Sequence, residues 1–109
     1  MIDNPEKTTP LLTALKAAVP FQVAVMPNLI DHLARQQKPV VVKSTETVSD
    51  VSYLGDEGGI VCHIKPEDAE TVIIVSLTKV RVPRSMPLAA AVFGYQKHRV
   101  KKLRKQGYN

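Results

Sequence analysis

The sequence predicts a single α+β domain, in which a mainly antiparallel sheet of about four strands is covered by two or three helices. The last helix is expected to be long and basic. The chain has 109 residues, of which 44% are hydrophobic, and this suits one domain with one core. The hydrophobic pattern is helical near both ends and extended, with many β-branched residues, in the middle.

The N-terminal part is predicted to be a flexible leader over residues 1–8, with the domain over 9–109. The leader is polar and has no periodicity. Thr9 followed by Pro10 predicts the start of a helix over 10–19, because Thr caps the free amides of a first turn and Pro suits the first helical position. The apolar residues that follow recur at helical spacing.

A short strand and a second helix are expected next. Residues 21–25 alternate larger apolar side chains with smaller ones, which is typical of a strand. Pro27 then predicts the start of a helix over 27–37, which ends before Lys38-Pro39 because a residue that precedes proline avoids helical backbone.

The central part predicts three strands, over 48–54, 60–65 and 71–82. The first two flank the loop Gly55-Asp56-Glu57-Gly58-Gly59, and a five-residue connection rich in Gly is typical of an antiparallel hairpin. The segment 72–75 is apolar on both of its faces. It is therefore predicted to be a central strand that is covered on both sides and is the most protected part of the sheet.

The C-terminal part predicts an amphipathic helix over 87–106. Its basic face is formed by side chains that share one side at 100° per residue: Lys97, Lys101, Arg104 and Lys105. Arg99 falls instead within the apolar sector. There it must extend its charge to water, pair with an acid or contact a partner.

The charges are distributed unevenly along the chain. The formal net charge is +5, but all ten acids lie in the first 70 residues, which carry a net charge of −4. The remainder has nine Lys and Arg and no acid, a net charge of +9. Such asymmetry indicates a nucleic acid, an anionic membrane or an acidic protein as partner, although bases at a helix end also keep a protein soluble.

The function predicted from this pattern is a non-catalytic module that contacts the backbone of RNA or DNA through the basic helix. Cations on one rigid face bind phosphates by releasing counterions and need no sequence readout. The predicted contacts are Lys97, Lys101, Arg104 and Lys105, extended by Lys79 and Arg81 from a different element. Tyr95 and Tyr108 are taken as the aromatic residues near this region, and so few aromatics argue against base stacking.

The alternative is a homo-oligomeric subunit. In this hypothesis the apolar face of the last helix, with Tyr95 and Val100 and with Arg99 at its edge, packs on another chain. An arginine within an apolar stripe suggests an acidic residue on the partner or on a second copy.

No catalytic, metal or cofactor residues are predicted. Cys62 and His63 are neighbours on a strand, so their side chains diverge, and Cys62 is expected to be a small core residue. The 55–58 loop has the letters of the glycine clamp of KH RNA-binding modules, but it joins strands, and its acids repel phosphate. As a metal loop, it has too few acids even with Asp50 and His63 close across the hairpin.

The location is predicted to be cytoplasmic, without a transmembrane segment. The longest apolar run, Leu88–Phe93, has six residues, whereas about 20 are needed to cross a bilayer. The N-terminus lacks the positive start and apolar stretch of a secretory signal. A single cysteine cannot form an internal disulfide, which agrees with a reducing compartment.

One enzymatic alternative comes from the order of elements over residues 21–105. This order resembles that of the bacterial mRNA interferases of the RelE type, which cleave RNA with Lys, Arg and Tyr. The resemblance implies metal-independent RNA cleavage, while the helix expected before residue 21 departs from the family's pattern. The residues that it implies for charge stabilisation and proton transfer are Lys79, Arg81, Arg84 and Tyr95.

Overall fold

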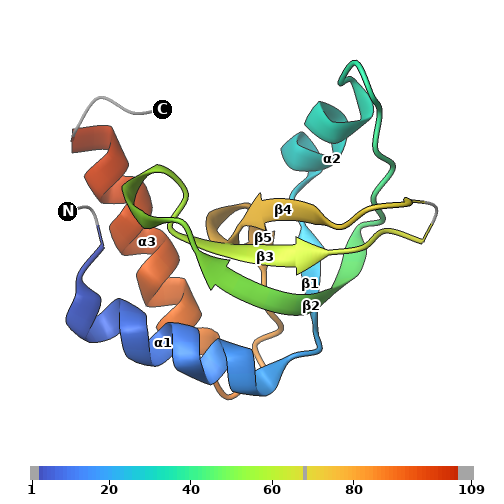
Figure 1. Cartoon of the computed structure of the whole chain (residues 1–109). Helices are drawn as coiled ribbons and strands as arrows, with labels where there is room; N and C mark the ends of the chain where they lie inside the picture. The colour runs from blue at the N-terminus through green and yellow to red at the C-terminus, as the bar shows by residue number, and fades with distance from the viewer. Residues whose placement is uncertain (1–2, 68, 106–109) are drawn as a thin grey trace.

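The computed structural model describes residues 3–67 and 69–105 and shows an α+β domain with three helices and a five-stranded antiparallel sheet. Figure 1 shows the sheet curling over α1 and beside α3. The helices are α1 (Pro5–Ala18), α2 (Pro27–Ala34) and α3 (Ala89–Lys105), and the strands are β1 (Phe21–Val25), β2 (Thr45–Tyr53), β3 (Ile60–Ile64), β4 (Ile73–Ser76) and β5 (Val80–Arg81).

The strand order is β4-β3-β2-β1-β5, so the last two strands lie at opposite edges of the sheet. They are joined only by a single 3-10 turn, η2 (Leu77–Lys79). Three residues bridge two opposite edges only because the sheet curls and brings those edges near each other. The turn begins at Ser76, whose hydroxyl accepts a hydrogen bond from the Thr78 amide at 3.2 Å, and this bond directs the chain out of β4.

The predicted strand over 71–82 is therefore wrong in two respects. It is two strands, and β4 is an edge strand rather than a central one. Val72 and Ile74 are 45% and 50% exposed, whereas four of the five residues of β3 are buried. Of these two, β3 is the interior strand, because β2 and β4 pair with its two edges.

The hairpin prediction is confirmed. β2 and β3 pair antiparallel, with Tyr53 opposite Ile60. Their connection contains a second 3-10 turn, η1 (Gly55–Glu57), and two residues with positive φ, Gly55 at 71° and Gly59 at 64°. Only glycine adopts this backbone without strain, which explains the Gly-rich composition. Asp50 and His63 are register partners, as expected.

The first helix begins earlier than predicted. Asn4 caps it by accepting a hydrogen bond from the Glu6 amide at 3.0 Å, and Pro5 occupies the first turn, so Pro10 lies inside the helix. The Asn-Pro pair carries the same start signal as Thr-Pro. Residues 3–8 consequently belong to the fold and not to a flexible leader, while residues 1–2 lie outside the described part.

The other helices differ from prediction mainly at their ends. α2 ends at Ala34 rather than at residue 37. α3 begins at Ala89 rather than at residue 87, and residue 106 lies outside the described part. The strand at 21–25 is confirmed.

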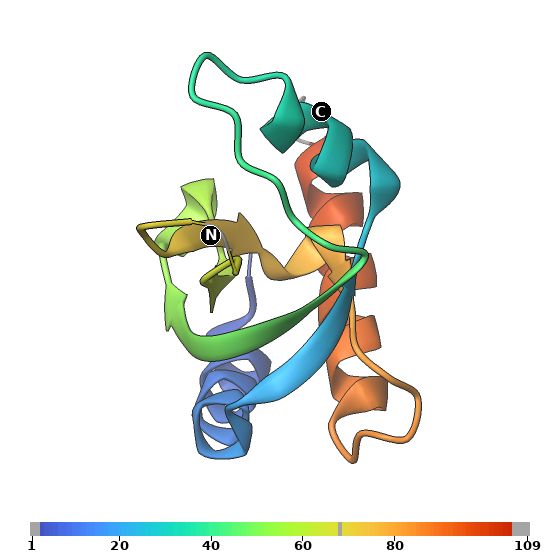
Figure 2. The same cartoon turned by 90° about the vertical axis from the view of Figure 1, so that its right-hand side faces the viewer.

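The main core lies between the sheet and the helices α1 and α3. Leu15 of α1 and Val92 of α3 are fully buried in one cluster that also contains residues of β2 and β3. Cys62 also lies in this core, which confirms that it is a small core residue. Figure 2 shows α1 beneath the curled sheet and α3 along its side. A second cluster, Val25, Leu33 and Val42, attaches α2.

Candidate functional site

The helix α3 has one face built into the protein and one face exposed. Val92, Tyr95 and Arg99 are its buried residues, and they recur at intervals of three and four residues, as one helix face requires. The other face carries cations and Phe93. The buried face determines which of the predicted residues are available to a partner.

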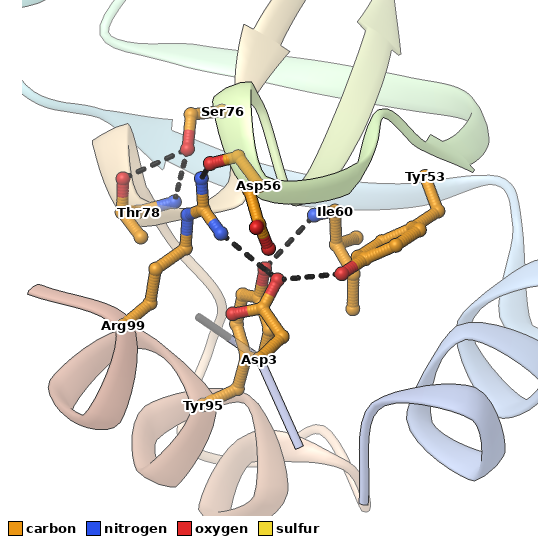
Figure 3. Close-up of polar contacts among 8 residues, drawn as sticks. All are labelled: Asp3, Tyr53, Asp56, Ile60, Ser76, Thr78, Tyr95 and Arg99. Carbon is orange, nitrogen blue, oxygen red and sulfur yellow. Dashed lines mark hydrogen bonds and ion pairs between the residues drawn. The ribbon is translucent and has the colours of Figure 1, made fainter. Parts of the chain in front are cut away.

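Arg99 makes a buried ion pair with Asp3, which is the acid that its position in the apolar sector requires. Its Nη1 donates to Asp3 Oδ2 at 2.8 Å, and the two side chains are 3% and 1% exposed. The Arg99 Nη2 donates to the carbonyl of Asp56 in η1 at 2.7 Å. Figure 3 shows Arg99 reaching from α3 to both partners. The guanidinium therefore joins the N-terminus, the β2–β3 loop and the last helix.

Two tyrosines complete this cluster, which we call the Asp3–Arg99 cluster (Asp3, Tyr53, Tyr95 and Arg99). The hydroxyls of Tyr53 and Tyr95 donate to Asp3 Oδ2 at 3.0 and 3.3 Å, and the Tyr95 oxygen accepts from the Ile60 amide at 2.9 Å. Burial raises the pKa of Tyr95 to about 12. Burial and the hydrogen bond to Asp3 also raise the pKa of Tyr53. Both phenols thus remain neutral donors at ordinary pH.

The close approach of α3 to the hairpin loop depends on Gly59. A Cβ atom at this position would lie 2.3 Å from the Tyr95 hydroxyl and 2.7 Å from Arg99 Cζ. A side chain at this position would therefore displace the ends of the Tyr95 and Arg99 side chains, which are held by hydrogen bonds in the cluster.

Two of the three residues predicted to contact another chain, Tyr95 and Arg99, are therefore used within this chain. They are 8% and 3% exposed. The third, Val100, is 37% exposed. The acid expected on a partner for Arg99 is Asp3 of the same chain.

The exposed face of α3 carries the predicted cations. Lys97, Lys101, Arg104 and Lys105 are all exposed, and none of their side chains makes an ion pair or a hydrogen bond to the rest of the described chain. The helix contains no acid. Its exposed face therefore offers positive charge that no described residue neutralises.

Phe93 lies on the same face as these cations. Phe93, Lys97, Val100 and Arg104 follow one another at intervals of four, three and four residues, and we call them the exposed stripe of α3. The Phe93 side chain is 68% exposed. Phe93 was not predicted as an aromatic residue near the basic region, although its spacing of four residues from Lys97 was the available signal.

The segment that carries Lys79 lies beside α3. The side-chain amide of Gln96 donates to the carbonyls of Leu77 and Val80, each at 2.7 Å. These bonds hold η2 and the start of β5 against the helix. Lys79 and Arg81 are exposed on these two elements, so the backbone at Lys79 is brought next to the helix that carries the other predicted contacts.

The residues implied by the resemblance to RNA-cleaving enzymes are not equally accessible. Lys79, Arg81 and Arg84 are exposed, but the Tyr95 hydroxyl lies in the Asp3–Arg99 cluster. Among residues 3–67 and 69–105, no group of three or more His, Cys, Asp or Glu side chains is placed to hold a metal ion. Burial raises the pKa of the Cys62 thiol to about 12, so this thiol is a poor nucleophile.

A groove of about 550 Å³ separates α1 from α3. Leu11 and Ala14 line it from α1, and Ala91 and Gly94 line it from α3. A Cβ atom at Gly94 would meet nothing within 4 Å, so the internal packing of the described chain does not require glycine there. His98 lies at the groove beside the basic part of the helix.

No protein family, curated protein or solved structure matches this chain. No helix in the described part is long and apolar enough to span a membrane.

Proposed function

We propose that this protein is a non-catalytic module that binds the phosphate backbone of RNA or DNA through the exposed, basic side of α3. The contacts are Lys97, Lys101, Arg104 and Lys105. The observation that carries the proposal is that these four side chains are exposed and have no acidic partner within the described chain.

The absence of internal partners matters because a phosphate gains most from a cation that is not already neutralised. Arg99 is the contrast on the same helix, since its charge is compensated by Asp3 at 2.8 Å and buried. It is therefore not a contact in this proposal. The four outer cations are not neutralised by the protein. They can therefore replace the counterions that are condensed on the phosphates of the nucleic acid, and the release of those counterions favours binding.

Lys79 and Arg81 extend the same surface. The Gln96 bonds to Leu77 and Val80 hold η2 and β5 against α3. A phosphate chain that runs along the helix thereby meets cations from more than one element. Contacts of this kind fix the position of a nucleic acid without reading its sequence.

The structure favours a nucleic acid over an anionic membrane as the partner. A helix that lies in a membrane surface needs a broad apolar face. In α3 the apolar residues Val92, Tyr95 and Leu103 are buried or half-buried, and the exposed large apolar side chains are only Phe93 and Val100.

The test compares two triple variants with the same change in charge. The first replaces Lys97, Lys101 and Arg104 by Gln. The second replaces Arg35, Lys38 and Lys65 by Gln; the first two of these are exposed in the connection after α2, and Lys65 is exposed directly after β3. Each removes two lysines and one arginine. We expect the first variant to bind a labelled oligonucleotide at low salt at least 10-fold more weakly than the wild type, and the second to change affinity less than 3-fold.

Fluorescence anisotropy with mixed-sequence RNA and DNA measures both affinities. Circular dichroism checks that the variants are folded, which is expected because all six side chains are exposed. If the wild type does not bind at micromolar concentration, or if both variants lose affinity equally, the proposed interface is wrong.

A further inference from the structure

Phe93 is the most exposed aromatic side chain in the part of the chain that the structure describes. It is 68% exposed, compared with 38% for Tyr53 and 8% for Tyr95. Single exposed apolar residues are ordinary on protein surfaces. The position of Phe93 is what makes it informative, because it begins the exposed stripe whose next members are Lys97, Val100 and Arg104.

The spacing places an aromatic ring one helical turn from a cation. Phe93 and Lys97 are four residues apart, which corresponds to about 6 Å along the helix axis. This is the scale of a single nucleotide, so a base that stacks on the ring keeps its own phosphate within reach of Lys97. Val100 and Arg104 repeat the alternation of apolar and cationic side chains on the next turns.

We propose that Phe93 stacks on an unpaired base, so that the preferred ligand of this helix is a single-stranded nucleic acid. This inference rests on the proposed function, because the cations supply the binding to phosphate. In a duplex, the bases are already stacked and paired, so their flat faces are not available to the Phe93 ring. Aromatic stacking with cations is the usual combination in proteins that bind single strands without sequence preference.

The exposure of Phe93 also allows a clean test. The ring belongs to neither core cluster, so its replacement is expected to leave the fold unchanged. Phe93→Tyr keeps the flat ring, Phe93→Leu keeps apolar bulk without the ring, and Phe93→Ala removes both. A role in stacking therefore predicts that Tyr retains affinity, whereas Leu and Ala lose it.

The probes are a labelled 12-nucleotide thymidine strand, an abasic strand of the same length and charge, and a 12-base-pair duplex. We expect Phe93→Ala to weaken binding to the thymidine strand by about 5- to 150-fold, the loss of one stacked base. We expect less than a 2-fold change on the abasic strand and on the duplex. Thermal unfolding of each variant confirms that the fold is retained.

The outcomes separate this inference from the proposed function. If Phe93→Ala binds all three probes as the wild type does, while the Lys97, Lys101 and Arg104 variant binds none, the stacking inference fails and the phosphate interface stands. If neither set of variants changes binding, both fail. If the wild type binds vesicles of phosphatidylserine and phosphatidylcholine but no strand, and Phe93→Ala abolishes that binding, the ligand is a membrane and both are overturned.

Discussion

The carboxylate of Asp3 accepts a hydrogen bond from Arg99 at 2.8 Å across a sequence separation of 96 residues. Both side chains are almost completely buried. The contact joins Asp3, the first described residue, to the last helix and so makes residues 3–4 part of the folded domain. It also gives Arg99 a structural role. The exposed cations of α3 differ from Arg99, because they have no acidic partner within the described chain.

Removing one partner of this pair should destabilise the protein strongly. We expect Asp3→Ala to lower the free energy of unfolding by about 3–5 kcal/mol, because it leaves the Arg99 charge buried without compensation. The double variant Asp3→Ala with Arg99→Met should be less destabilised than the sum of the two single variants. Urea unfolding measures all four proteins. A loss below about 1 kcal/mol for Asp3→Ala would contradict the burial of the pair.

Replacement of Gly59 by Ala tests the close approach of α3 to the hairpin loop. Gly55 is the matched control, since its φ is also positive, at 71°, but a Cβ there would meet nothing within 4 Å. Gly55→Ala should cost only the backbone strain, about 1–2 kcal/mol. Gly59→Ala should cost about 1–3 kcal/mol more, because its methyl group collides with Tyr95 and Arg99. If urea unfolding gave equal losses of unfolding free energy for Gly55→Ala and Gly59→Ala, the close contact of Gly59 with Tyr95 and Arg99 would be contradicted.

The stability of the protein should fall in alkaline solution, between pH 9 and 12. The pKa of Cys62 is raised from 9.0 to about 12 and that of Tyr95 from 10.0 to about 12, both chiefly by burial. The unfolded chain therefore loses these protons first, and stability, complete below pH 9, decreases as the pH rises through this window. The decrease from pH 9 to 10 should be smaller in Cys62→Ala. Stability that is independent of pH from 9 to 11 in the wild type would contradict the burial of both groups.

Much of the local structure was predictable from the sequence, because its signals are local. The strand at 21–25, the start of α2 at Pro27 and the hairpin around residues 55–59 follow from alternation, a proline at a first helical position and glycines at a turn. Cys62 was also placed correctly in the core. Each of these features depends on neighbours within a few residues along the chain.

The errors concern relationships between distant residues. The run Val72–Val75 looks like a central strand because it is apolar throughout, but strand pairing decides which strands are central. The sequence left three possibilities for Arg99, namely extending its charge to water, pairing with an acid or contacting a partner, and Asp3 could be identified only from the fold. The exposure of Phe93 is likewise a property of how α3 packs.

Hydrogen exchange tests the corrected position of these strands. The amides of β3 should exchange more slowly than those of β4, because β3 is bonded on both edges and β4 on one. We expect the amides of residues 73–76 that point away from β3 to exchange about as fast as solvent-exposed amides. Those of residues 60–64 should exchange almost only when the whole domain unfolds. Slower exchange over residues 73–76 would contradict the strand order.

The central claim is that the exposed cations of α3 bind nucleic-acid phosphates, and the salt dependence of affinity tests it most directly. For single strands, the slope of log K against log salt concentration is about −0.7 per phosphate contacted. The four cations of α3 should therefore contribute about −3 to the slope of the wild type. Replacing Lys97, Lys101 and Arg104 by Gln should make the slope less negative by about 2, whereas replacing Arg35, Lys38 and Lys65 should leave it unchanged. Identical slopes for the wild type and both variants would contradict the claim.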